Sequence, residues 1–161
     1  MNNPKKCWAP SADRPIVHLQ RIREYIYVFS ATNPFTGEVF SLILPICNTD
    51  AMIVFLNELS AQYSDYKNII FVDGATWHST KNIPYYDNIR FIFLPAGSPE
   101  LNPTEHLWEH IREKYLGNKV FDSLDALENE MVDILVNVSL EHDVIKKLTG
   151  FHWLVKNTNV C

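Results

Sequence analysis

Residues 68–74, NIIFVDG, and residues 89–94, IRFIFL, are two short apolar runs that decide the fold class of the chain. In the first run, four consecutive apolar residues are followed by the polar Asp73. This pattern is typical of a strand that is buried on both faces and ends at the surface. The second run has the same apolar character, so both runs are predicted to be buried strands of an α/β sheet.

A hairpin is predicted upstream of these strands. Residues 24–31, EYIYVFSA, and 38–44, EVFSLIL, are rich in aromatic and β-branched residues, which favour strands. The segment 33–37, NPFTG, between them has the composition of a turn. A hairpin followed by alternating helices and strands indicates a mixed rather than a purely parallel sheet. In open sheets of this kind, sites form at the carboxyl ends of strands.

Three helices are predicted, and each begins with a polar residue that can cap its start. Apolar residues recur in them at helical spacing. They extend from Asn48 or Thr49 to about Tyr63, from Asn102 to about Leu116, and from Ser123 through Val138. The aromatic tail segment 149–154, TGFHWL, is expected to pack against the domain.

The bulk composition fits a single globular domain over residues 1–161. Hydrophobic residues make up 47% of the chain and charged residues 20%. No apolar run reaches the roughly 20 residues that a membrane helix needs. The three cysteines, Cys7, Cys47 and Cys161, are far apart and odd in number, so they form neither a disulfide framework nor a CxxC metal site. They are interpreted as reduced thiols of a cytosolic protein.

The net charge of −5 argues against a domain dedicated to nucleic-acid binding, since such domains usually carry an excess of basic residues. It does not argue against an enzyme that acts on DNA through bound metal ions. Such a site must concentrate carboxylates, and a separate basic module can supply the affinity for DNA.

Asp73 and Glu105 are the principal candidate site residues, and each also has an ordinary structural interpretation. Asp73 ends an apolar strand, where a carboxylate is rigidly held and faces solvent, but an aspartate at this place is more often a turn residue. Glu105 lies three residues after Asn102, which is the spacing of a helix capping box. His78 and Glu100 are weaker candidates for the margin of a site. A histidine beside a tryptophan is more often structural, and a loop glutamate is more often solvated.

The pattern HLWEH at residues 106–110 predicts a different class of enzyme. His106 and His110 lie one helical turn apart with Glu109 between them, which matches the H-x-x-E-H pattern of inverted zinc peptidases. In such a site two histidines bind zinc and the glutamate is the general base. The alternative interpretation is a solvated helix face, because the apolar residues of this helix fall on the opposite face.

Longer motifs resemble a known family. The segments 71–80, FVDGATWHST, and 89–118, IRFIFLPAGSPELNPTEHLWEHIREKYLGN, are similar to those of mariner-like DDE transposases encoded by bacterial insertion sequences. The string SPELNPTEHLW is long and specific, so this resemblance outweighs the five-residue zinc-peptidase match. Shorter segments that also resemble the family lie at residues 6–10, 23–31, 33–45, 48–52, 123–128 and 149–151.

The resemblance implies an RNase H-like fold, and a triad of two aspartates and one glutamate that holds two divalent ions, Mg²⁺ or Mn²⁺. The second aspartate corresponds to Asp73 and the glutamate to Glu105. One ion would activate water or a DNA 3′-hydroxyl, and the other would stabilise the leaving oxygen. The implied function is DNA strand cleavage and 3′-end strand transfer during transposition in the bacterial cytoplasm. Transposon-end and target DNA are the implied partners, and the complete enzyme is expected to be a homodimer without membrane attachment.

One departure from the family pattern concerns the first catalytic aspartate. In the family it belongs to an Asp-Glu pair on a strand before the KCWAP-like segment, and this sequence contains no Asp-Glu pair. The chain is therefore expected to lack the first, central strand and the preceding DNA-binding part. Neighbouring strands would then expose unpaired edges, to be closed by rearrangement, by a partner chain or by ill-defined packing. Such a chain is expected to be nearly inactive alone, and a non-enzymatic transposase remnant or inhibitor is a further alternative.

Overall fold

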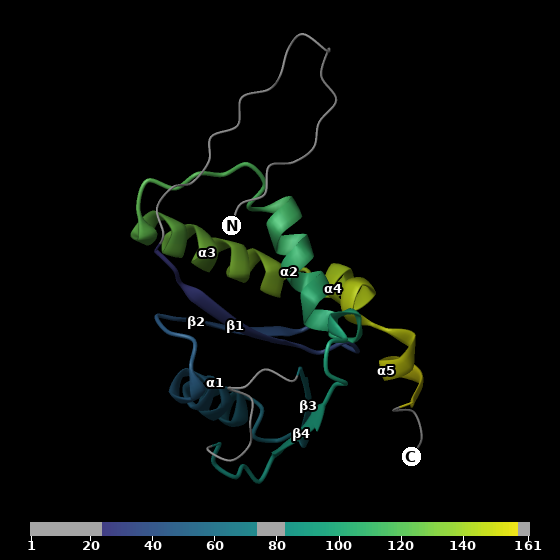
Figure 1. The fold of residues 1–161 in the computed structure, drawn as a ribbon. Coiled ribbons are helices and arrows are strands. Elements are labelled where there is room, and N and C mark those ends of the chain that lie inside the picture. Colours follow the sequence, from purple (N-terminus) through teal and green to yellow (C-terminus); the bar gives the residue numbers. More distant parts are fainter. Residues whose placement is uncertain (1–23, 74–82, 158–161) are drawn as a thin grey trace.

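The computed structural model describes residues 24–73 and 83–157 (Figure 1). The elements of this part are β1 (Tyr27–Thr32), β2 (Val39–Leu44), α1 (Thr49–Gln62), β3 (Asn68–Val72), β4 (Ile89–Phe93), α2 (Pro103–Lys114), α3 (Leu124–Ser139), α4 (His142–Thr149) and α5 (His152–Asn157). A 3₁₀ turn, Pro99–Leu101, precedes α2. The first seven of these helices and strands follow the predicted order, whereas α4 and α5 were not predicted. None of the helices in the described ranges is both long and apolar enough to cross a membrane.

The four described strands form two separate two-stranded sheets. β1 and β2 pair antiparallel, with Tyr27 opposite Leu44, which confirms the predicted hairpin. β3 and β4 pair parallel, with Asn68 opposite Ile89. The mixed α/β character is therefore confirmed, but no ladder joins the hairpin to β3 and β4 within the described ranges. Residues 1–6, whose presence as a central strand would contradict the expected gap, lie outside the described residues.

Helix α1 joins the two sheets through one hydrophobic core. The Asn48 side chain accepts a hydrogen bond from the backbone N–H of Ala51 at 2.9 Å, which confirms one of the two predicted caps. Apolar side chains of α1 pack against Phe29 of β1 and Ile89 of β4. The buried residues of the helix are Ala51, Met52, Phe55, Leu56 and Leu59. Because burial of apolar surface is the main stabilising term, this helix holds the sheets together without a shared strand.

A second core lies on the other face of the hairpin. Val28 and Ile43 point into it, because successive residues of a strand face opposite sides of the sheet. The hairpin is thus sandwiched between α1 and helices α2 to α4 (Figure 1). Helix α3 begins at the predicted cap, where Ser123 Oγ accepts from the N–H of Ala126 at 3.1 Å. The buried residues of this core are Leu107, Ile111, Met131, Ile134, Val138 and Ile145.

Helix α4 docks on the turn of the hairpin through Gly37. This glycine is buried and has a φ of +80°, and a Cβ added to it would lie 1.9 Å from the backbone oxygen of His142. Only glycine fits such a conformation and such a close approach. The chain then continues through α5, where Leu154 is buried. The predicted packing of the aromatic tail is therefore confirmed.

Candidate functional site

Asp73 and Glu105 line the same cleft. The cleft is open to solvent and has a volume of about 280 Å³. Asp73 enters it from the end of β3 and Glu105 from the first turn of α2. Both residues are exposed, so a hydrated ion can reach their carboxylates. The remaining wall is formed by Pro95, Ala96, Gly97, Ser98, Pro99 and Asn102.

The parallel pairing of β3 with β4 places Asp73. The backbone N–H of Leu94 donates to the carbonyl oxygen of Val72 at 2.8 Å, which continues the ladder to the last residue of β3. Val72 is buried whereas Asp73 is exposed, so the chain leaves the core at this point. The wall residues of the cleft begin just after β4. They lie near Asp73 because the carboxyl ends of the parallel strands β3 and β4 are at the same edge of the sheet. Sites of α/β sheets usually form at this edge.

The start of α2 is built by Asn102 rather than by a capping box. Asn102 Oδ1 accepts from the N–H of Thr104 at 3.1 Å, and Pro103 occupies the first helical position. In a capping box, the Glu105 carboxylate would accept from the N–H of Asn102. That N–H instead donates to the carbonyl oxygen of Pro99 at 2.9 Å. The carboxylate of Glu105 is therefore not needed to close the helix start.

The two weaker candidates do not join this pair in the described structure. Glu100 is exposed on the 3₁₀ turn, between the cleft residues Pro99 and Asn102, and is not itself part of the cleft wall. His78 lies outside the described residues.

The two histidines of the HLWEH pattern have separate structural partners. The His106 ring packs edge-on against the Phe151 ring, with 4.9 Å between centroids. His110 Nε2 lies 2.9 Å from Glu141 Oε2. Within the described ranges, no three His, Cys, Asp or Glu side chains are grouped so as to hold a metal ion. The described residues therefore give the zinc-peptidase alternative no third ligand, and the apolar face of α2 is buried as the structural interpretation requires.

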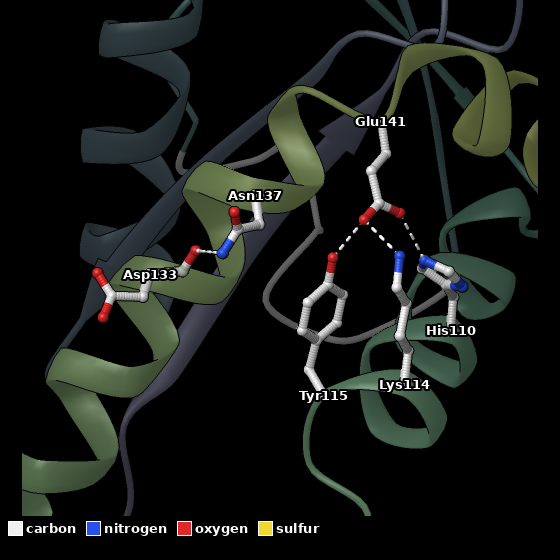
Figure 2. Close-up of polar contacts among 6 residues, drawn as sticks. All are labelled: His110, Lys114, Tyr115, Asp133, Asn137 and Glu141. Atoms are coloured by element: carbon white, nitrogen blue, oxygen red, sulfur yellow. Dashed lines mark hydrogen bonds and ion pairs between the residues drawn. The ribbon is translucent and has the colours of Figure 1, made fainter.

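Glu141 is the centre of a polar cluster that the sequence did not reveal (Figure 2). Its carboxylate accepts from Lys114 Nζ at 2.5 Å, contacts His110 Nε2 and accepts a short hydrogen bond from the Tyr115 hydroxyl. His110 and Lys114 lie in the second half of α2, and Tyr115 directly follows this helix. Glu141 lies between α3 and α4. The cluster therefore fixes the C-terminal end of α2 to the α3–α4 junction.

The charge of Glu141 is stabilised by this cluster. Partial burial acts to raise the pKa of Glu141, but hydrogen bonds from Lys114, Tyr115 and His110 outweigh it and lower the pKa to about 2. The hydrogen bond to Glu141 raises the pKa of Lys114. Burial, and then the hydrogen bond to Glu141, raise the pKa of Tyr115.

The donor chemistry of the cleft fits a hard divalent cation. Carboxylate oxygens are the ligands that Mg²⁺ prefers, and an open cleft leaves space for the waters that this ion keeps. Asp73 and Glu105 are the acidic residues of the cleft wall. Two carboxylates suit such an ion, although they provide only part of what a pair of ions needs.

Comparison with known proteins identifies the family. Residues 1–128 match the family described as DDE superfamily endonuclease, a range that includes both Asp73 and Glu105. The chain belongs to this family. The predicted relationship to DDE transposases is therefore confirmed.

Two other proteins are similar in sequence to this chain. An uncharacterized protein of Sinorhizobium fredii, y4pE/y4sA, is 37% identical over 117 residues, which cover 68% of this chain and 87% of that protein. The transposable element Tcb2 transposase of Caenorhabditis briggsae is 32% identical over 78 residues, which cover 40% of this chain and 29% of the relative. The chain thus spans less than a third of the length of Tcb2 transposase.

The fold is similar to that of Mos1 transposase, solved as a paired-end complex with the left transposon end. The TM-score is 0.66 at 16% sequence identity, with 91% of this chain and 46% of the Mos1 chain covered. At this identity the likeness shows the fold alone, which is the RNase H-like architecture that the resemblance implied. The chain spans about half the length of the Mos1 protein.

Proposed function

We propose that this chain forms the carboxylate-bearing part of a transposase catalytic domain, in which Asp73 and Glu105 hold divalent ions, Mg²⁺ or Mn²⁺. The observation that carries the proposal is that these two side chains, from β3 and α2, line one open cleft. Membership of the DDE superfamily endonucleases supports the same chemistry. The proposed substrates are transposon-end and target DNA, and the proposed complete enzyme is a homodimer with residues 1–161 in one catalytic domain.

The proposed reaction is an in-line displacement at a DNA phosphorus. In cleavage, a water oxygen bonds to phosphorus while the P–O3′ bond breaks, and the 3′ oxygen leaves with a proton as a 3′-hydroxyl. In strand transfer, that 3′-hydroxyl oxygen bonds to a phosphorus of the target and displaces its 3′ oxygen. Bound divalent ions supply the charge that activates the attacking oxygen and stabilises the leaving oxygen. Asp73 and Glu105, which line the cleft, would hold these ions.

A third carboxylate completes the site in this proposal. β1 and β3 each belong to a two-stranded sheet, so each has one edge without a strand partner in the described part of the chain. Unpaired strand edges are templates for another strand. We propose that a strand bearing the first catalytic aspartate, which residues 1–161 do not contain, pairs there and is supplied by another polypeptide segment. Helix α1, which packs on both sheets, keeps the two edges in a fixed relation.

Titration of the purified chain with Mn²⁺ tests the metal site. Mn²⁺ broadens NMR signals of nuclei near it, so the amide signals at the end of β3 and the start of α2 are expected to broaden together. Asp73→Asn and Glu105→Gln are each expected to weaken this effect. The matched controls are Asp87→Asn, an exposed carboxylate before β4, and Glu109→Gln, one turn along α2. Equal broadening in all variants would contradict the assignment of Asp73 and Glu105 as metal ligands.

A further inference from the structure

We propose that Phe151 and Trp153 are positioning residues that set the relation between the two carboxylates of the cleft, because their rings bridge β3 and α2. The inference rests on the proposed function of Asp73 and Glu105, and it adds residues near the end of the chain to that site. These aromatic residues lie in the segment that connects α4 to α5 and in the first turn of α5.

Trp153 contacts the element that carries Asp73. Its ring meets the Phe71 ring nearly perpendicular, with 5.4 Å between centroids and an interplanar angle of 85°. Phe71 lies two residues before Asp73, and residues two apart on a strand project from the same face. Trp153 therefore packs on the face of β3 from which the Asp73 side chain is expected to project.

Phe151 contacts the element that carries Glu105. Its ring lies 4.9 Å from the His106 ring, at an interplanar angle of 70°. His106 is the next residue after Glu105 in the first turns of α2. The two ring contacts are therefore only two residues apart in the aromatic segment, yet they reach both elements that carry a carboxylate.

The aromatic segment is itself rigidly held. The Phe151 carbonyl oxygen accepts from the N–H groups of Leu154 at 2.9 Å and Val155 at 3.0 Å, which starts α5. Leu154, the residue after Trp153, is buried. Gly150 N–H donates to the Lys146 carbonyl oxygen at 2.9 Å, and a Cβ on Gly150 would lie 2.5 Å from that oxygen. These contacts hold the aromatic segment in a fixed position against the domain.

An ion bound by both Asp73 and Glu105 requires a fixed separation between the two carboxylates. Asp73 and Glu105 are both exposed and come from elements that no strand ladder joins, so their separation depends on packing around them. Residues that orient metal ligands without touching the metal typically change metal affinity by about 10–100-fold when mutated. Loss of one ring contact is therefore expected to lower the affinity for an ion bound by both carboxylates by about tenfold, although both carboxylates are still present.

The test is the Mn²⁺ titration applied to the full chain with Trp153→Ala, Trp153→Phe, Phe151→Leu and the remote control Phe40→Leu. Phe40 makes a comparable ring contact with Phe55 in the α1 core, 5.4 Å between centroids, away from the cleft. In the wild type, amide signals next to Asp73 and Glu105 are expected to broaden at one common Mn²⁺ concentration. In Trp153→Ala and Phe151→Leu, the two groups of signals are expected to respond separately and at about tenfold higher concentration. Trp153→Phe and Phe40→Leu are expected to behave as the wild type.

The outcomes separate the two proposals. If Asp73→Asn and Glu105→Gln weaken Mn²⁺ binding while Trp153→Ala and Phe151→Leu do not, the positioning role is wrong and the metal site stands. If Phe40→Leu weakens binding as much as Phe151→Leu, the effect is general destabilisation and the positioning role is again wrong. If neither carboxylate variant changes binding, the metal site fails and the positioning role fails with it. Should Trp153→Ala not fold, Phe151→Leu alone decides.

Discussion

Glu141 Oε2 lies 2.9 Å from His110 Nε2 and so ties the α3–α4 junction to the helix that carries Glu105 (Figure 2). The Glu141 backbone oxygen also accepts from the N–H groups of Val144 and Ile145, both at 3.0 Å, at the start of α4. One residue therefore starts α4 through its backbone and holds α2 through its side chain. We therefore interpret the cluster as a structural contact that stabilises the position of α2, the helix that carries Glu105.

Removing the charge of Glu141 is expected to destabilise the fold. Glu141→Gln keeps the size of the side chain but loses the charge that Lys114, Tyr115 and His110 stabilise, so the free energy of unfolding should fall by about 1–2 kcal/mol. Urea denaturation followed by circular dichroism measures this change. Glu128→Gln, an exposed residue of α3, is the control and should change stability by less than about 0.5 kcal/mol. Equal stability of Glu141→Gln and the wild type would show that the cluster contributes nothing.

The stabilisation by Glu141 is expected to depend on pH. Its pKa in the folded chain is about 2, below the ordinary value of 4.5. A group with a lowered pKa stabilises the fold fully above its unfolded pKa and loses that contribution as pH falls towards its folded pKa. The stability difference between wild type and Glu141→Gln should therefore be constant above about pH 4.5 and shrink between pH 4.5 and 2. A difference that grows on acidification would contradict the assigned direction.

Gly37 is expected to be intolerant of any side chain. Gly37→Ala adds left-handed backbone strain and a Cβ that would lie 1.9 Å from the His142 oxygen, so α4 must shift. The expected loss of stability is about 3 kcal/mol or more. Gly97→Ala is the matched control, because Gly97 has a φ of +74° but nothing within 4 Å of an added Cβ. It should lose only the backbone strain, about 1–2 kcal/mol, and a similar loss in both variants would show that the α4 contact is unimportant.

The elements that the sequence predicted are those with local signals. The hairpin has its turn composition, and α1 and α3 begin at Asn48 and Ser123, whose side chains accept the expected capping hydrogen bonds. Helix α4 was missed because it has eight residues and few apolar positions, and isolated helices of that length are not stable in water. Its stability comes from burial of Ile145 and from docking on Gly37, which are tertiary contacts.

The same distinction applies to the site. Asp73 and Glu105 were predicted as site residues from the resemblance of residues 71–80 and 89–118 to DDE transposases, because their local patterns also fitted a turn residue and a helix cap. The structure places both side chains on one cleft. The hydrogen bond from Asn102 to Pro99 was not predictable, because it depends on a 3₁₀ turn that a three-residue spacing does not reveal. The cluster joins Glu141 to residues at least 26 positions away, and no sequence period links them to it.

Substitutions at Asn102 and Glu105 are expected to differ in their effect on stability, because Asn102 caps α2 whereas Glu105 is proposed to bind metal. Asn102→Ala removes the hydrogen bond to the Thr104 N–H and should lower stability by about 1 kcal/mol. Glu105→Gln should change stability by less than about 0.5 kcal/mol, since Pro99 accepts the N–H that a capping box would use. Thermal or urea denaturation of both variants gives the comparison. A loss of about 1 kcal/mol in Glu105→Gln would restore the capping interpretation.

The purified chain is expected to nick supercoiled DNA only at background level in Mg²⁺. Asp73 and Glu105 provide two carboxylates, and within the described ranges no third metal-binding side chain joins them. Two ions about 3.5–4 Å apart concentrate four positive charges, which two carboxylates neutralise only by half. The expected result is equal, low nicking by the wild type and Asp73→Asn. Strong Mg²⁺-dependent nicking that Asp73→Asn abolishes would mean that two carboxylates suffice, and the proposed strand with a third would then be unnecessary. Nicking that survives in Asp73→Asn and in an Asp73→Asn, Glu105→Gln double variant would come from another site or from a contaminating nuclease.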